Sequence, residues 1–89
     1  MSVDEMMNIG TLGMTYSERE AEKSRRLSII ERINILCDAM NRAEYKIKRS
    51  AQTENVSAER RIIKTKQKEL NDIKSRESAW LKKVAPHLY

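Results

Sequence analysis

The chain contains 89 residues with a mass of 10.4 kDa and a net charge of +5, so it can form one small domain at most. Hydrophobic residues make up 39% of the sequence and aromatic residues 4%, with no Phe, which excludes a large independent core. Chains of this size usually gain support from disulfides, a metal or a partner subunit, and one cysteine with one histidine excludes the first two. We therefore expect self-association.

The sequence contains no run near the roughly 20 apolar residues of a membrane span. Its N-terminus also lacks the basic and then apolar segments of a signal peptide. We expect a cytoplasmic protein with no membrane partner, in which the thiol of Cys37 is reduced.

Helix breakers are confined to the two ends of the chain. The only proline, Pro86, and the only glycines, Gly10 and Gly13, lie outside residues 14 to 85. Ala, Glu, Lys, Arg, Leu and Met dominate the remainder, and these residues favour helices. The predicted fold class is all-α, with a short N-terminal helix and two long antiparallel helices.

The first predicted element is a short helix over about residues 3 to 9. Ser2 precedes Glu5 by three residues, the spacing at which the two side chains cap a helix start. Gly10 ends the helix because glycine readily adopts the left-handed conformation of a helix terminus. Residues 10–13 are predicted to form a hinge, so we divide the chain into a front segment, 1–16, and a helical hairpin, 17–89.

The second predicted helix runs from about residue 18 to 48, with Ser17 and Glu20 repeating the capping signature. Its apolar residues follow one another at steps of 4, 3, 4, 3 and 4: Ile29, Ile33, Leu36, Met40, Ala43 and Ile47. This heptad spacing is typical of coiled-coil packing against a partner helix. At about 1.5 Å per residue the helix is roughly 46 Å long.

Residues 49–57 are polar and contain the candidate caps Thr53, Asn55 and Ser57, so a turn is predicted there, although residues 49–51 could extend the helix. The third predicted helix runs from Ala58 to Val84, because Ala85 precedes a proline. Its apolar stripe has gaps, at Lys66 or Gln67 and at Glu77, and consists of Ile63, Leu70, Ile73, Trp80 and Val84. A short loop between two long helices predicts an antiparallel hairpin.

The apolar face of the second helix is wider than one partner helix can cover, because further apolar residues flank the stripe: Leu27, Ile30, Ile35 and Cys37. A lone two-helix hairpin also gains little net stability, since ordering the chain opposes burial. We therefore favour a homo-oligomer of hairpins. The alternative is a three-helix monomer in which the front helix covers the additional face.

The positive charge is concentrated around the predicted turn. Residues 42–68 contain nine Lys and Arg against three Glu, a net charge of +6, and the remainder of the chain carries −1. An antiparallel hairpin gathers these side chains at one end, which favours an anionic partner such as a nucleotide, a nucleic acid or an acidic protein surface. The alternative is a solvated surface that only confers solubility.

No catalytic set, metal site or cofactor site is predicted. Cys37 falls within the apolar band, His87 lies in the tail, and no nucleophile with a base and an orienting group can be assembled. We therefore expect no enzyme activity. The aromatic rings are more informative: Tyr45 lies off the heptad among basic residues, and Tyr16 stands next to a helix start, where a ring can stack on a base or pack on Ala21 or a neighbour as a hydrophobic staple.

With Tyr16, the capped front helix and the two long helices, the chain resembles the phage-encoded helical-hairpin sponges (anti-CBASS proteins) that sequester cyclic nucleotide signals of host immunity. The resemblance covers the architecture of the whole chain. It implies a hexamer of interlocked hairpins in the host cytoplasm. It also implies that Tyr16 stacks on a base, that Lys23 or Arg26 contacts a phosphate, and that Arg60 or Arg61 contacts a second one.

The sequence thus leads to the hypothesis of a non-enzymatic, self-associating helical binding protein that occupies or sequesters an anionic partner. Sequestration of a nucleotide second messenger, as a small viral inhibitor of host defence, is its most concrete form. The alternative is a structural or adaptor coiled-coil subunit that binds another protein, or a protein that binds nucleic acid without sequence specificity.

Overall fold

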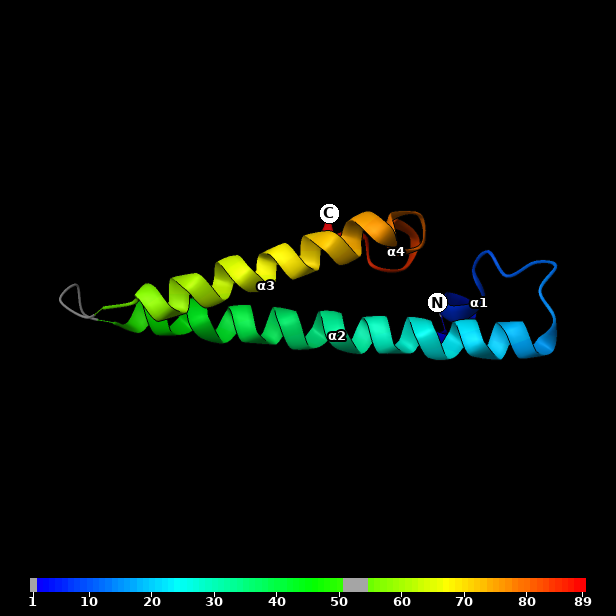
Figure 1. Ribbon diagram of the computed structural model, residues 1–89, viewed down its shortest axis with the longest axis horizontal. Coiled ribbons are helices and arrows are strands. Elements are labelled where there is room, and N and C mark those ends of the chain that lie inside the picture. The colour runs from blue at the N-terminus through cyan, green and yellow to red at the C-terminus, as the bar shows by residue number, and fades with distance from the viewer. Residues whose placement is uncertain (1, 51–54) are drawn as a thin grey trace.

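The computed structural model describes residues 2–50 and 55–89, which form helices joined by turns, with no strand among them (Figure 1). The helices are α1 (Val3–Asn8), α2 (Tyr16–Arg49), α3 (Ser57–Arg76) and α4 (Ser78–Val84), followed by the 3-10 turn η1 (Pro86–Leu88). Helix α3 packs back along α2, giving an elongated hairpin of 58 × 21 × 18 Å. The predicted all-α hairpin with a short front helix is confirmed.

Helix α1 begins and ends close to the predicted positions. The hydroxyl of Ser2 accepts a hydrogen bond of 3.2 Å from the backbone N–H of Glu5, so the predicted cap is present. The helix ends at Asn8, and the chain then turns through Gly10 and Gly13, whose φ angles are +76° and +91°. These values lie in the left-handed region that favours glycine, which explains why the hinge forms here.

Helix α2 starts two residues before its predicted start, because Thr15 and not Ser17 is the cap. The Thr15 hydroxyl accepts a hydrogen bond of 3.3 Å from the backbone N–H of Glu18 and donates one of 3.0 Å to its carboxylate. Thr15 and Glu18 have the same spacing as Ser17 and Glu20, so both pairs match the capping signature. The earlier start adds further helical backbone hydrogen bonds and places Tyr16 inside the helix.

The predicted heptad stripe of α2 faces the core. Four of its members are buried and the two outer ones, Ile29 and Ile47, are half-buried; the buried ones are Ile33, Leu36, Met40 and Ala43. The side chain of Leu36 is completely covered. The helix ends at Arg49, with Ser50 as its C-cap, so the helical extension does not include Ser50, and Ala51 lies outside the described residues.

The turn residues account for the start of α3 only in part. Helix α3 begins at Ser57, and its N-cap position is Val56, which makes no side-chain cap. The side-chain carbonyl of Asn55 accepts a hydrogen bond of 2.9 Å from the backbone N–H of Ser57. The predicted cap Thr53 lies outside the described residues.

The third helix was predicted to be continuous over residues 58–84, and this prediction is wrong. The chain bends at Glu77 and divides into α3 and α4. The backbone of Glu77 departs from helical geometry (φ −113°, ψ 24°), yet its N–H still bonds to the Ile73 carbonyl at 2.9 Å. The adjacent residues Trp80 and Leu81 of α4 are both buried, with 5% and 0% exposure. Adjacent residues of a helix point about 100° apart, so more than one neighbouring segment must cover them.

Helices α1 and α4 fill the open end of the hairpin. In Figure 1, α2 and α3 lie close together near the turn and separate toward the other end, where α1 and α4 are found. The buried core there combines Met7 of α1, Leu36 of α2 and Leu81 of α4. The front helix thus covers part of the wide face of α2, as the three-helix alternative required, and Ile30 and Cys37 are half-buried against this core.

Two other members of the wide face remain in contact with solvent. Leu27 is 43% exposed and Ile35 is 51% exposed. The chain therefore covers its apolar surface incompletely, and the homo-oligomer is taken up below as a proposal.

Candidate anion-binding site

Four basic side chains lie on one side of α3, in the half of the hairpin next to the turn. We call this half the turn half, and the other half, which contains α1 and α4, the open half. Arg60, Lys64 and Lys68 follow one another at i, i+4 and i+8, and Arg61 precedes Lys64 by three residues. Residues at these spacings are neighbours on a helix surface, with Cβ atoms about 5–6 Å apart. All four are exposed. We call them the basic stripe, which consists of Arg60, Arg61, Lys64 and Lys68.

Polar and apolar groups accompany the basic stripe. Arg60, Lys64 and Lys68 border a shallow hollow on α3, which is also lined by Ile63, Thr65, Gln67, Asn71 and one carboxylate, that of Asp72. The side-chain amide of Gln67 donates a hydrogen bond of 2.9 Å to the side-chain carbonyl of Asn71. The hollow therefore offers cations, hydrogen-bonding amides and a small apolar surface side by side.

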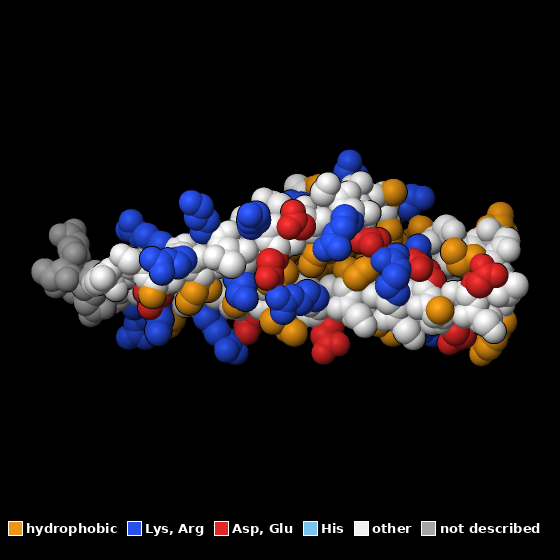
Figure 2. All heavy atoms as spheres, in the orientation of Figure 1, with side chains coloured by type: hydrophobic (Ala, Val, Ile, Leu, Met, Phe, Trp, Pro, Cys, Tyr) orange, Lys and Arg blue, Asp and Glu red, His pale blue; other side chains and the backbone are white. Residues whose placement is uncertain are grey.

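Few carboxylates neutralise the turn half of the molecule. Within residues 2–50 and 55–89, its ion pairs are Arg42 with Asp38 at 3.0 Å and Lys46 with Glu59 at 3.9 Å, and the basic stripe forms none. Figure 2 shows Lys and Arg side chains spread over both helices near the turn. Like charges at i, i+4 destabilise a helix by about 0.2–0.5 kcal/mol per pair, so this arrangement opposes folding slightly.

The open half has the opposite character, because its basic side chains are held by acidic ones. Lys23 bonds to Asp4 at 2.6 Å, and Arg32 of α2 bonds to Glu69 of α3 at 2.7 Å. The hydrogen bond to Asp4 raises the pKa of the Lys23 ammonium group. These cations serve contacts within the chain.

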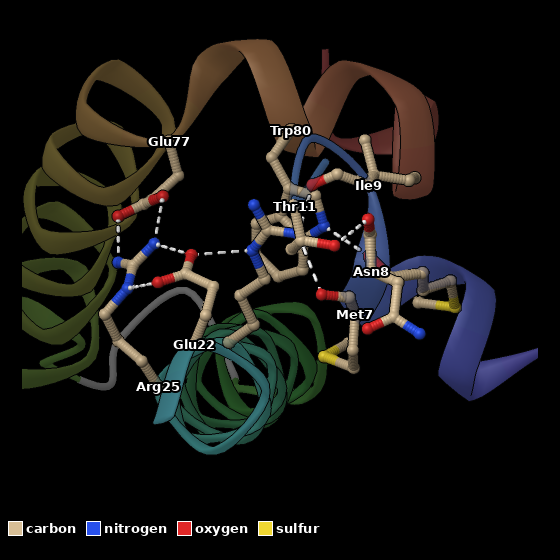
Figure 3. A network of polar contacts seen from close by, with 10 residues as sticks. Met7, Asn8, Ile9, Thr11, Glu22, Arg25, Glu77 and Trp80 are labelled. Atoms are coloured by element: carbon tan, nitrogen blue, oxygen red, sulfur yellow. Dashed lines mark hydrogen bonds and ion pairs between the residues drawn. The ribbon is translucent and has the colours of Figure 1, made fainter. Parts of the chain in front are cut away.

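Arg25 and Glu22 form the centre of a network between α2 and the bend at Glu77 (Figure 3). The Arg25 guanidinium contacts the carboxylates of both Glu22 and Glu77 at 2.6 Å. The hydrogen bond from Arg25 lowers the pKa of the Glu22 carboxyl group, and the two carboxylates raise the pKa of Arg25. The network fixes the position of the bend relative to α2.

Arg26 is the buried cation of this network, with 8% exposure. Its Nη1 donates to the backbone carbonyls of Met7 at 3.0 Å and Ile9 at 2.6 Å, and its Nε donates to Glu22 at 2.8 Å. The guanidinium also lies over the Trp80 ring, 5.1 Å from its centroid. Carbonyls at the end of α1 are thereby satisfied by a side chain of α2, which holds the front helix in place.

The five residues that the sequence suggested as a ligand site fall into two separate groups. Arg60 and Arg61 belong to the basic stripe, whereas Tyr16, Lys23 and Arg26 lie in the first part of α2. Helix α2 has 34 residues and is therefore about 51 Å long, and Arg60 lies near its far end. One chain does not bring the two groups together.

Within the second group, the three side chains have different surroundings. Tyr16 is 78% exposed, so the alternative of a hydrophobic staple on Ala21 is wrong, and Ala21 itself is exposed. Lys23 is held by Asp4, and a ligand role for Arg26 would require it to give up its bonds to Met7 and Ile9. Tyr16 alone of these offers an uncommitted surface.

Sequence reasoning counted Lys64 and Lys68 in the basic segment 42–68, but of the residues in the basic stripe it assigned only Arg60 and Arg61 to the site. The spacing of Arg60, Lys64 and Lys68 at i, i+4 and i+8 was the signal that would have grouped them. Tyr45 is 59% exposed, and its hydroxyl accepts a hydrogen bond of 2.8 Å from Arg49, whose guanidinium also lies 5.4 Å from the centroid of the ring.

Within the described part of the chain, no group of three or more His, Cys, Asp or Glu side chains is placed to hold a metal ion. Likewise, none of the helices described has the length and apolarity needed to cross a membrane. Comparisons with protein family models, curated proteins and solved structures find no match to this chain. The resemblance to cyclic-nucleotide sponges therefore stays a prediction.

Proposed function

We propose that this protein is a non-enzymatic helical binding protein that binds an anionic partner through the basic stripe of α3. The observation that carries the proposal is the exposure of four neighbouring cations, none of which pairs with a described carboxylate. Clustered like charges oppose helix formation, and an anionic partner would remove that cost on binding. The open half, where acidic groups hold Lys23, Arg25, Arg26 and Arg32, is less suited to this role.

A more specific form of the proposal is a self-associating sponge for a nucleotide second messenger, acting as a small viral inhibitor of host defence. Tyr16 is exposed and available to stack on a base, but the pairs Arg32–Glu69 and Lys46–Glu59 place the basic stripe about 25–45 Å further along α2. A nucleotide site that uses both would need two copies, with the start of α2 of one copy beside the turn half of the other. Self-association is thus part of this form of the proposal.

A second candidate function is that of an adaptor that binds another protein. The observation favouring it is the exposure of apolar residues on α2 and α3, notably Ile35 at 51% and Ile62 at 42%. Apolar side chains that remain in water contribute little to the stability of the fold. They are typical of interaction surfaces when they lie together.

The test is a titration of the full chain with a cyclic dinucleotide and with a short single-stranded oligonucleotide, followed by thermal unfolding and calorimetry. At a hundredfold excess over the dissociation constant, a ligand stabilises the folded state by about 2.7 kcal/mol, which raises Tm by roughly 10 °C or more. The variant Arg60→Glu/Arg61→Glu should lose most of this shift. The matched control is Lys82→Glu/Lys83→Glu, which reverses two adjacent exposed cations on α4.

Unchanged affinity in the Arg60→Glu/Arg61→Glu variant would remove the basic stripe from the mechanism. Absence of a shift with either anion would contradict the proposal and favour the adaptor. Light scattering at micromolar concentration gives the subunit number, and a strict monomer with ligand bound would contradict the self-associating form.

A further inference from the structure

Ion pairs join α2 to α3 and to the bend at Glu77 along one edge of the hairpin. One position in the regular spacing of these pairs is not filled by an ion pair. The α2 members are Arg25, Arg32 and Lys46, which pair with Glu77 at 2.6 Å, Glu69 at 2.7 Å and Glu59 at 3.9 Å. These α2 positions are separated by 7 and 14 residues, so the heptad repeat skips one place, and Ala39 occupies it.

At the interruption, apolar side chains are open to solvent between the two helices. A groove there is lined by the half-buried Ala39 and the buried Ala43 of α2 and by the exposed Ile62 of α3, with Tyr45 as a neighbouring aromatic ring. Ile62 is 42% exposed, and Ile35, one helical turn before Ala39, is 51% exposed. We call this feature the Ala39 groove; its lining combines the apolar and aromatic residues with polar ones, which are two cations, one carboxylate and one amide: Ala39, Ala43, Tyr45 and Ile62, with Arg42, Lys46, Glu59 and Asn41. The small alanine side chains leave room that a larger residue would fill.

The rim of the Ala39 groove is basic. The side chains of Arg42 and Lys46 are 81% and 75% exposed. Arg42 pairs with the largely exposed Asp38, and Lys46 has only a long contact of 3.9 Å with Glu59. Surface ion pairs of this kind contribute little to stability, so a partner can replace them at little cost.

We propose that the Ala39 groove binds an acidic amphipathic helix of another protein. Two antiparallel helices form a groove along their length into which a third helix can pack, and an apolar anchor of that helix would fill the space above the alanines. Carboxylates that flank the anchor would reach Arg42 and Lys46. The inference rests on the proposed function in one respect, the preference of the turn half for an anionic partner.

Charge and polarity favour this occupant over two others. A second copy of the same face would bring Arg42 and Lys46 of one chain against the same cations of the other, which is unfavourable. A nucleic acid would satisfy these cations but would leave Ile35 and Ile62 in water. An acidic amphipathic helix satisfies both parts of the surface.

The test uses a synthetic helical peptide of roughly three heptads, with leucines at heptad spacing, glutamates beside them, and alanine and glutamine elsewhere. A peptide of the same composition in scrambled order is its control. Binding to the full chain is measured by calorimetry and mapped by amide chemical shifts. The amphipathic peptide should bind at least tenfold more tightly than the scrambled one, with the largest shifts at Ala39, Ala43 and Ile62.

The variant Ala39→Glu fills the groove and adds a negative charge, so it should weaken peptide binding by about tenfold or more. Ala21→Glu is the matched control, because it makes the same change on an exposed part of α2 distant from the groove. Ile35→Ser provides a second variant that removes an exposed apolar contact without filling the groove, and it should also weaken binding. Circular dichroism confirms that each variant folds.

Equal binding of the two peptides, or shifts confined to the basic stripe, would overturn the groove while leaving anion binding by the turn half intact. Loss of oligonucleotide binding in the Arg60→Glu/Arg61→Glu variant, with peptide binding retained, would support the groove as a separate site. A concentration-dependent dimer that disappears in the Ala39→Glu variant would identify the groove as a contact between copies and overturn the proposal.

Discussion

The indole Nε1 of Trp80 donates a hydrogen bond of 2.9 Å to the backbone carbonyl of Met6, joining residues 74 positions apart in the sequence. This bond connects α4 with α1 across the open end of the hairpin. Arg26 lies over the same indole ring and bonds to the carbonyls of Met7 and Ile9. One arginine and one tryptophan thus hold the first helix of the chain against the helix that follows the bend.

Replacing Arg26 by Leu should destabilise the protein by about 3 kcal/mol. The substitution leaves the carbonyls of Met7 and Ile9 and the carboxylate of Glu22 without their buried partner. For a chain of this size, that loss corresponds to a fall in Tm of roughly 12–24 °C. Arg61→Leu, at an exposed site, is the control and should change Tm by less than a few degrees. Equal effects of the two substitutions would contradict the role assigned to Arg26.

Leu36→Ala should cost about 2–5 kcal/mol of unfolding free energy, because Leu36 has no exposed surface and its truncation leaves a cavity. Leu12→Ala makes the same chemical change at a residue that is fully exposed in the hinge, and should change stability by less than about 0.5 kcal/mol. Denaturant unfolding of the two variants measures the difference. A loss below 1 kcal/mol for Leu36→Ala would show that this position is not buried in solution.

Substituting Gly10 by Ala should destabilise the protein by about 1–2 kcal/mol through the backbone alone. A Cβ atom added to Gly10 would meet nothing within 4 Å, so no clash contributes, but the φ angle of +76° is unfavourable for alanine. Gly10→Asn should cost less, because asparagine tolerates the left-handed region better than alanine. Chemical denaturation of both variants tests this order, and a reversed order would contradict the hinge conformation.

Acidification should weaken the fold through Glu22. The folded pKa of Glu22 is lowered from its ordinary value of 4.5, so its contribution is fully present above that value and is lost as the pH falls through the lower folded pKa. Glu22→Gln should cost about 1–2 kcal/mol at pH 7 and progressively less below pH ~4.5. Glu20→Gln, at an exposed residue, is the control. Unfolding free energies measured from pH 7 to pH 3 would refute the role of Glu22 if the difference between wild type and Glu22→Gln did not shrink.

Oligonucleotide binding by the basic stripe should depend on salt. Each phosphate contact on a single strand contributes a slope of about −0.7 in a plot of log affinity against log salt concentration, so three or four contacts give roughly −2 to −3. The Arg60→Glu/Arg61→Glu variant should bring the slope at least about one unit closer to zero. Binding isotherms between low and physiological salt measure it. A slope near zero in the wild type would mean that phosphate neutralisation does not drive binding.

The local pattern of the sequence predicted the elements whose structure depends on nearby residues. The heptad spacing of α2 identified Ile33, Leu36 and Met40 as core residues, and Ser2 and Gly10 identified the ends of α1. The start of α2 was displaced because Thr15 and Ser17 both have a glutamate three residues later, and the pattern does not rank two equivalent caps.

Features that depend on contacts between distant segments were missed. The bend at Glu77 is followed by Trp80, which bonds to Met6 of α1, a contact that no local spacing encodes. Arg26 was assigned to a ligand through the resemblance to cyclic-nucleotide sponges, whereas in the structure it is buried and bonds to carbonyls of the front segment. The separation of Tyr16 from the basic stripe follows from the length of α2.

The hydrogen bond between Met6 and Trp80 also sets the order in which the molecule can be completed during its synthesis. The front helix can pack on α2 early, because Lys23 and Arg26, which hold it, are close to it in the sequence, whereas the bond to Trp80 must wait until the segment after the bend has left the ribosome. Contacts between such distant positions form slowly, because a long intervening chain must first be ordered. Until then the carbonyl of Met6 lacks its partner on α4.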